Sequence, residues 1–313
     1  MKRILKTIKN FVKIWIYSAY DFIKVVCFSN MVYKRTNKEA LRSRIMINLH
    51  RIEKGLTYAN FKPYFGLYFF DNLIKDLNTL KGAFGENTFP YFEGISALEA
   101  YKNRHVELGY EVDRFPFDKF PNTDVKFNNV GAKKVSDFTS DFHQMVYLRS
   151  SVRNFDGPAD PKLIEESVQM AINTPSVCNR QPWKVYFFSQ KDKVQELLKF
   201  QNGNRGFSDT IESLIIVTGN LSEMEFSIER HQIFIDGGLF SMSLIYSLFS
   251  KGVSSCCLNW CTSPINDYKA HKVTNIPFNE EIIMYIAVGT SSKDINVTCS
   301  PKKLLDDVLI NEV

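Results

Sequence analysis

Two short segments of this chain gather the side chains best suited to chemistry. The first, Arg149–Phe155, reads RSSVRNF and places two arginines and two serines within five positions. The second, Pro175–Trp183, reads PSVCNRQPW and carries amide side chains at a proline-bounded break. Guanidinium groups and hydroxyls suit an oxyanion, and amides suit the polar edge of a flat heterocycle. The segments therefore predict two halves of a pocket for one ligand, with a phosphate at one end and a flat polar ring at the other.

Each segment also has a simpler explanation. An arginine pair in a loop is typical of solvated surface charge, and Trp183 is expected to anchor its loop in the core. Cys178 has no histidine nearby in sequence that would activate it as a nucleophile. The ring contacts are therefore assigned to Asn179 and Gln181, with Pro175 and Ser176 at the start of the same loop.

Two further segments are weak by themselves. Gly252 allows close backbone approach, and Ser254, Ser255 and Cys256 are small enough to line a flat ring. A plain buried strand explains the same residues. Lys302 adds a cation near the end of the chain, where a solvated tail is the simpler interpretation.

The order of the motifs resembles that of the FMN-dependent nitroreductase family. The resemblance covers roughly residues 140–313 and uses RSSVRNF, PSVCNRQPW, the predicted helix 236–248 followed by GVSSC, the strand ending at Val288-Gly289-Thr290, and the closing PKKLL. It implies an α+β fold, a homodimer with FMN at the subunit interface, and ping-pong hydride transfer from NAD(P)H.

The resemblance also implies roles for individual residues. Carried over by position, Arg149, Ser150, Ser151 and Arg153 would hold the phosphate and the pyrimidine side of FMN. Pro175, Ser176, Asn179 and Gln181 would meet the ring or the ribityl chain, and Ser255 and Cys256 would lie beside the ring. Lys302 stands where the family often has a phosphate-binding arginine, which keeps the charge but loses the planar fork. The flavin carries the chemistry in such a site, so no catalytic residue and no metal are predicted.

The pattern of helices and strands predicts two parts. Residues 138–313 are expected to form a mostly antiparallel central sheet flanked by helices, with strands near 184–189, 214–218, 254–258 and 282–289. Residues 1–137 are expected to form a helical extension, with a helix over 37–58 capped by Gly55 and a linker over about 113–137. The six cysteines suit neither a zinc site nor a disulfide framework, which favours reduced thiols in a cytoplasmic protein.

The front of the chain is strongly basic. Residues 1–62 hold fourteen lysines and arginines against three acidic residues, which leaves the rest of the chain acidic within a total net charge of +5. Lys2, Lys6, Lys9 and Lys13 share one face of a predicted amphipathic helix over about 1–30. Such a helix either lies peripherally on the inner face of a membrane or docks on protein. Its apolar run is too short and too interrupted for a signal peptide or a membrane span, and no nucleic-acid-binding module is recognised.

These observations predict an FMN-dependent oxidoreductase that passes hydride from NAD(P)H to an unknown small-molecule acceptor. One alternative is a flavin-binding dedicated dehydrogenase or regulator without general NAD(P)H turnover, because the extension can cover the pocket. His50–Leu56, HRIEKGL, resembles an extension of longer family members, some of which are linked to surface-polysaccharide biosynthesis. Another alternative is a membrane-surface interaction protein driven by residues 1–30.

Overall fold

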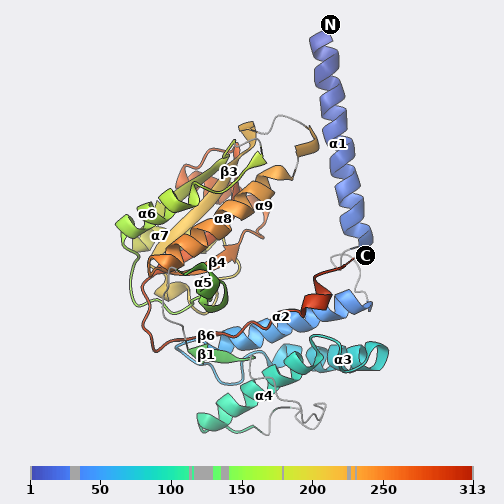
Figure 1. Cartoon of the computed structure of the whole chain (residues 1–313), viewed down its shortest axis with the longest axis vertical. Coiled ribbons are helices and arrows are strands. Elements are labelled where there is room, and N and C mark those ends of the chain that lie inside the picture. Colours follow the sequence, from blue (N-terminus) through green and yellow to red (C-terminus); the bar gives the residue numbers. More distant parts are fainter. Residues whose placement is uncertain are drawn as a thin grey trace. The chain divides into compact units, whose positions relative to one another are not determined.

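The chain folds into two compact units, each built from two stretches of sequence (Figure 1). The computed structural model describes residues 2–28, 36–112, 115, 130–134, 141–177, 180–223, 227–229 and 231–311. We call Met1–Ile23 with Val135–Ile295 the sheet unit, and Lys24–Lys134 with Asn296–Val313 the helical unit. The division at 134/135 lies close to the boundary predicted at 137. Residues 296–313, predicted to belong to the sheet domain 138–313, cluster with the helical unit instead.

The first helix, α1 (Lys2–Phe28), contains the division between the units at Ile23/Lys24. It confirms the helix predicted over about 1–30 and is strongly amphipathic. Its apolar side chains are solvent-exposed from Ile4 to Ile16, including Phe11 at 71% and Trp15 at 66%. Lys6, Lys9 and Lys13 are exposed on the opposite side of the helix.

The sheet unit is built on a four-stranded sheet of order β2-β3-β5-β4, and every neighbouring pair is antiparallel. The strands are β2 (Trp183–Phe188), β3 (Ser213–Asn220), β5 (Glu280–Gly289) and β4 (Ser254–Asn259). Branched residues dominate the two central strands, as buried strands require. Together with its flanking helices, this sheet confirms the predicted α+β class.

Helices α6 (Pro161–Ala171) and α8 (Gln232–Ser250) lie side by side over one face of the sheet (Figure 1). Phe240, Leu244 and Leu248 of α8 share a buried core with Ile215 and Ile286 of the central strands. By length and composition α8 could cross a membrane, but 56% of that window is buried, which is typical of a core helix. Gly252, with φ of +77°, follows the helix as predicted.

The remaining elements of the sheet unit are shorter. They are α5 (Phe142–Leu148), α7 (Lys191–Leu198), α9 (Pro264–Thr274) and the single-turn 3-10 helices η3 (Ser208–Thr210), η4 (Leu221–Glu223) and η5 (Ser227–Glu229). Side-chain caps begin three of the helices, because Asp141, Asp160 and Ser263 each accept a backbone N–H from the first turn. Helices α7 and α9 were not predicted from the sequence.

The helical unit packs α2 (Lys38–Leu56), α3 (Leu67–Phe84) and α4 (Tyr91–Glu107) around their own core. Fully buried Leu49, Ile52, Leu73, Leu77 and Leu98 belong to this core. A two-stranded ribbon of β1 (Ala132–Lys134) and β6 (Asn296–Thr298) and the 3-10 turn η6 (Leu305–Asp307) complete the unit.

The HRIEKGL segment forms the last two turns of α2. The prediction that Gly55 caps this helix is wrong. Gly55 is not the C-cap, because the helix continues to Leu56 and ends at Thr57. A Cβ at Gly55 would overlap the ring of Phe65, so the glycine makes room for that ring. Glu53 is fully buried and accepts hydrogen bonds from the backbone N–H groups of Gly131 (3.1 Å) and Ser300 (3.3 Å). This part of the motif therefore joins α2 to both strands of the ribbon.

His105 is a buried, neutral histidine at the centre of an aromatic cluster. Its Nε2 accepts the backbone N–H of Tyr64 at 3.0 Å, so Nδ1 carries the proton that is donated to the carbonyl of Tyr101 at 2.8 Å. The rings of Phe61, Tyr101 and Phe115 lie within 5.1 Å of its ring, centroid to centroid. Burial lowers the pKa of His105, although the hydrogen bond to Tyr101 opposes that shift.

We therefore expect the helical unit to lose stability in mild acid. A histidine whose folded-state pKa is depressed contributes stability above its unfolded pKa of about 6.5, and loses it as the pH falls from there towards the folded pKa. Hydrogen exchange of α4 amides should accelerate from pH 6.5 downwards, after correction for intrinsic exchange rates. His105→Gln should be less stable at pH 8 and should show a flatter pH profile. The control His50→Gln removes an exposed histidine and should keep the wild-type profile; an unchanged profile in His105→Gln would contradict the assignment.

Candidate functional site

The RSSVR segment lies along the free edge of the sheet. It begins where α5 ends, and the backbone N–H of Val152 donates to the carbonyl of Ser255 in β4 at 3.0 Å. Val152 and Phe155 are buried, which fixes the segment against the sheet. Val152 thereby anchors the four polar residues on either side of it, Arg149, Ser150, Ser151 and Arg153. The structure brings together this first predicted segment and the Ser255–Cys256 segment.

The two arginines place positive charge at this edge of the sheet, and no described carboxylate neutralises it. Arg153 is 8% exposed, and its Nη1 donates to the carbonyl of Ser151 at 3.4 Å. Arg149 is half-buried at the C-terminus of α5. Within the described residues, no carboxylate forms an ion pair with either guanidinium group. Both groups therefore keep a charge with which to bind an anion.

Strand pairing separates the two adjacent cysteines of β4. Cys257 pairs with Ile286 and Ser255 pairs with Val288, and both partners belong to the core on the α8 face. Cys256 points to the opposite face and is 1% exposed, because successive side chains of a strand alternate. Cys257 is exposed, whereas Ser255 is buried. The side chain that β4 presents near the arginines is therefore that of Cys257, which the sequence analysis did not include.

The pKa of the Cys257 thiol is set by burial and by the charges of nearby residues. Desolvation by the surrounding protein raises the pKa of its thiol to about 11, with a smaller contribution from Cys256, and Arg149 and Arg153 act in the opposite direction. The side chain still reaches solvent at the strand edge. The thiol is consequently neutral at pH 7, and it lies within the field of both guanidinium groups.

The second predicted segment is held by a different set of contacts. Ser176 Oγ accepts the backbone N–H of Gln181 at 2.9 Å, and Gln181 has a left-handed φ of 52°. The buried Asp236 of α8 accepts the N–H of Val177 at 3.3 Å and Gln232 Nε2 at 2.8 Å. Pro175 and Gln181 are exposed and Ser176 is half-buried, whereas Asn179 and Cys178 lie outside the described residues.

Arg180 of the same segment has a structural role. Its guanidinium group donates to Glu229 at 2.6 Å and to the carbonyl of Glu223 at 2.7 Å. The loop before β2 is thus bonded to α8 and also to η4 and η5, the two 3-10 turns that precede α8. These ties orient Gln181 and the start of β2.

The two predicted halves of the pocket lie far apart within one chain. Segment 175–182 precedes β2, one edge of the sheet, whereas RSSVR lies against β4, the other edge. Three strand spacings of about 4.8 Å separate the edges. Ser255 pairs with Val288, and Val288 pairs with Ser213. RSSVR is therefore level with the C-terminal end of β2, because Phe188 pairs with Leu214, next to Ser213. The second segment lies at the N-terminal end of β2, about 17–20 Å away along the strand at 3.3 Å per residue. Combined with the separation across the strands, this puts the two halves roughly 20–25 Å apart.

Helix α8 also separates the two segments. Asp236, in its first turns, holds the second segment, and Tyr246 contacts Phe142 of α5, which leads into RSSVR, with 5.6 Å between ring centroids. Ten residues of helix separate these contacts, or about 15 Å at 1.5 Å per residue. The two segments therefore lie near opposite ends of α8.

Lys302 belongs to the helical unit and has an exposed side chain. Its phosphate-binding role therefore stays a prediction. Among the described residues there is no group of three or more histidine, cysteine, aspartate or glutamate side chains that could hold a metal.

A buried carboxylate on the other face of the sheet was missed by the sequence analysis. Glu280, 1% exposed, accepts hydrogen bonds from Lys184 (2.7 Å), Tyr186 (2.9 Å) and Thr218 (2.7 Å). Burial by itself would raise the pKa of Glu280, but these three bonds outweigh it and lower the pKa. The signal was present in the alternation of Lys184 and Tyr186 with apolar residues in β2. The satisfied cluster joins three strands and is structural.

Known structures resemble this chain over about half of its length. A nitroreductase family protein from Streptococcus pneumoniae is similar over 55% of this chain and 100% of its own, with 18% identity and a TM-score of 0.47. A protein described as an NADH oxidase from Clostridium acetobutylicum covers 54% of this chain and 99% of its own, with 17% identity and a TM-score of 0.46. An FMN-dependent nitroreductase from Clostridium difficile covers 54% and 98%, with 14% identity and a TM-score of 0.45. No protein-family model and no curated protein matches the sequence.

Proposed function

We propose that this protein is an FMN-dependent oxidoreductase that takes hydride from NAD(P)H and passes it to a small-molecule acceptor. The observation that carries the proposal is the gathering of Arg149, Ser150, Ser151 and Arg153 against the β4 edge. The ordered motifs of the sequence support the same function. Nitro compounds are one class of acceptor that such a flavin would reduce.

The residues at the β4 edge fit the phosphate end of FMN. Arg149 and Arg153 carry guanidinium charges that no described carboxylate neutralises in an ion pair, and a planar fork suits a phosphate. Ser150 and Ser151 are half-buried beside them and add hydroxyl donors. When bound, the flavin would supply the hydride chemistry. The chain would bind the phosphate and orient the ring, and the neutral thiol of Cys257 would offer a compact, uncharged surface nearby.

The amide end of the site would come from a second copy of the chain. Pro175, Ser176 and Gln181 lie roughly 20–25 Å from RSSVR in one protomer, by the strand spacings given above. They lie at the opposite end of α8 from α5. If α8 packs antiparallel against α8 of a partner, the 175–182 loop of one copy approaches RSSVR of the other. A homodimer would therefore complete two identical sites.

The outer surface of α8 supports this assembly. Phe234, Ile235, Leu239 and Met242 are exposed by 37–53%, although the opposite side of the helix is already buried in the core. A helix that is apolar all round is normally covered on every side. We infer that the outer face of α8 forms the centre of the dimer interface.

A second proposal concerns α1, which we infer binds the surface of an anionic membrane. The observation that favours it is the exposure of both faces of the helix. Its wide apolar face carries Phe11 and Trp15, and its basic face carries Lys6, Lys9 and Lys13 without an acidic residue before Asp21. Helices of this type lie in the interface plane with their apolar face buried among the lipids.

Purified protein should carry flavin or bind added FMN. Replacing Arg149 removes a charge-assisted bond worth about 1.5–3 kcal/mol, so Arg149→Gln should weaken FMN binding by roughly 10-fold to 100-fold in a fluorescence titration. Arg205→Gln, an exposed arginine of the same unit, is the matched control and should bind as the wild type does. A colourless protein that gains no FMN would sink the proposal. Stopped-flow mixing with NADH and NADPH then tests turnover, and a flavin that neither reduces would favour the dedicated dehydrogenase or regulator.

The dimer should depend on the outer face of α8. Leu239→Lys places a charge at the centre of that face without disturbing the protomer core, since Leu239 is 46% exposed. We expect light scattering to show a monomer, and FMN affinity to fall at least tenfold because each site loses its second half. The control Ile265→Lys changes an equally apolar residue of α9 that is 67% exposed, and it should remain dimeric. A dimeric Leu239→Lys variant with normal FMN binding would contradict this interface.

Membrane binding should be electrostatic. The full chain should co-sediment with vesicles that contain anionic lipid at 0.1 M salt, and the bound fraction should fall at 1 M salt, where the screening length is about 3 Å. Each basic residue near the surface contributes about 1 kcal/mol, so the triple variant Lys6→Glu, Lys9→Glu, Lys13→Glu should bind more than tenfold more weakly. A matched triple reversal at exposed Lys62, Lys102 and Lys133 is the control. Equal binding to neutral vesicles would refute the idea.

A further inference from the structure

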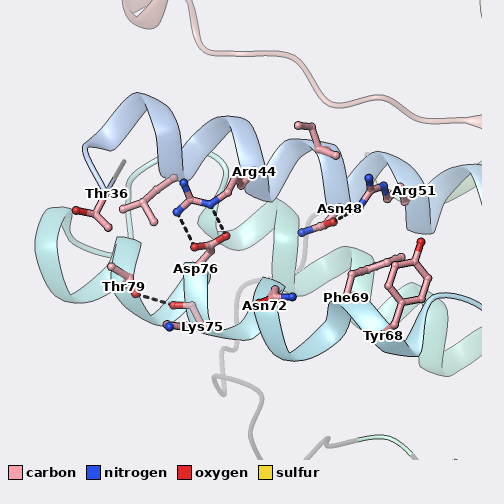
Figure 2. Close-up of a pocket in the computed structure, with 12 residues that line it drawn as sticks. Thr36, Arg44, Asn48, Arg51, Tyr68, Phe69, Asn72, Lys75, Asp76 and Thr79 are labelled. Atoms are coloured by element: carbon pink, nitrogen blue, oxygen red, sulfur yellow. Dashed lines mark hydrogen bonds and ion pairs between the residues drawn. The ribbon is translucent and has the colours of Figure 1, made fainter. Parts of the chain in front are cut away.

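The helical unit contains a polar groove between α2 and α3 that the flavin proposal does not use (Figure 2). The cavity has a volume of about 480 Å³, within the range of about 300–1,000 Å³ that holds small ligands. Arg44, Asn48 and Arg51 line it from one face of α2, where they recur at helical spacing. Tyr68, Asn72 and Lys75 line it from α3.

The groove carries an excess of positive charge. Its charged lining residues are Arg44, Arg51, Lys75 and Asp76. Arg44 and Asp76 neutralise each other through two parallel bonds, Nε to Oδ2 at 2.9 Å and Nη2 to Oδ1 at 2.8 Å. The Arg51 and Lys75 cations remain to attract an anion. Figure 2 shows the Arg44–Asp76 pair at one end of the groove and Arg51 at the other.

Arg51 is held in a fixed position. Its Nη1 donates to Asn48 Oδ1 at 3.0 Å, and its guanidinium carbon lies 5.7 Å from the ring centroid of Phe69. A cation held over an aromatic face is partly pre-organised, and less entropy is lost when it binds. Its side chain is nevertheless exposed, so an anion can reach the remaining donors.

Asn48 is the buried polar group of the site. It is 7% exposed, and its carbonyl oxygen is used by Arg51. Its amide nitrogen lies on the side away from Arg51 (Figure 2). Asn72 adds a second amide, on the facing helix. These donors suit phosphate oxygens or the hydroxyl groups of a ring.

Tyr68 gives the groove an aromatic edge. Its side chain is 81% exposed, although its neighbours Phe69 and Phe70 in the first turn of α3 are buried. Ile47, 49% exposed, lies on the facing helix. An exposed aromatic ring near the cation of Arg51 (Figure 2) is a combination that binds a flat or ring-shaped group attached to an oxyanion.

We propose that this groove binds a soluble phosphate-bearing ring compound, such as a nucleotide or a sugar phosphate. Arg51 binds the phosphate, and Tyr68 packs on the ring at the same end of the groove. Asn48 and Asn72 bind polar ring substituents, and Lys75, beside Asp76 at the other end, attracts the anion through its charge. The site lies within the helical unit and does not rest on the flavin proposal. It gives the HRIEKGL segment a binding function through Arg51, beside the structural function of Glu53.

Calorimetric titration of the full chain tests the phosphate contact with inorganic pyrophosphate as the probe. Arg51→Gln should weaken binding by roughly tenfold, which corresponds to about 1.4 kcal/mol. Lys75→Gln should weaken it by a smaller factor, because Lys75 acts on the anion through its charge from the other end of the groove. Lys62→Gln, an exposed lysine outside the groove, is the matched control and should bind as the wild type does. Circular dichroism confirms folding, and Lys75→Gln is informative even if Arg51→Gln is destabilised, because the Lys75 side chain is exposed.

The same titration distinguishes this groove from the proposed flavin site. If Arg149→Gln abolishes pyrophosphate binding and Arg51→Gln and Lys75→Gln do not, the anion binds at the β4 edge and the groove proposal is overturned. Absence of binding in the wild type overturns it as well. Loss of binding in the groove variants alone supports it, whether or not the protein binds FMN.

A second probe tests the ring contact. UDP should bind several-fold more tightly than pyrophosphate, and uridine without its phosphates should bind weakly. Tyr68→Ala should remove the advantage of UDP and leave pyrophosphate binding unchanged. If UDP and pyrophosphate bind equally and Tyr68→Ala has no effect, the groove is a simple anion site and the ring assignment is wrong.

Discussion

Helix α8 is apolar on both of its sides, and most of the sheet unit is arranged around this fact. One side inserts Phe240, Leu244 and Leu248 into the core with the central strands. The other side leaves Phe234, Ile235 and Leu239 in solvent. The same helix holds the 175–182 loop at one end through Asp236 and contacts α5 at the other through Tyr246. A single element thus separates the two halves of the candidate flavin site, and its exposed apolar side is the surface through which we propose that a second copy binds.

The position of carboxylates decides which arginines are structural and which can bind a ligand. Arg180 and Arg44 look equally suited to an anion in the sequence, yet Glu229 and Asp76 occupy their guanidinium forks. Arg149 and Arg153 lie in a segment anchored by Val152, and no described carboxylate pairs with either. Arg51 is fixed by an amide and an aromatic ring, which position it without cancelling its charge. Ligand sites in this protein are therefore inferred where positive charge is held in place but not neutralised.

Local patterns were sufficient to predict most elements of the sheet unit. The apolar runs of β3 and β5, the proline that begins α6 and the glycine after α8 all act within a few residues, and the structure confirms them. Helices α7 and α9 are short, with mixed composition, and they escaped notice because tertiary packing stabilises them more than their own sequence does. Gly55 was misassigned as a cap because its partner, Phe65, is ten residues away across a turn.

The sequence by itself determined the residue types of the candidate site and their order along the chain, since side-chain chemistry and helix and strand periodicity are local properties. It could not determine which residues meet. Strand register placed Cys257 rather than Cys256 on the face near the arginines, because each step along a strand reverses the side. The sheet order put RSSVR and PSVCNRQPW at opposite edges, and the packing of α2 on α3 formed a charged groove from residues without a shared motif. These outcomes depend on long-range pairing, whose free energy comes from burying the cores of the two units.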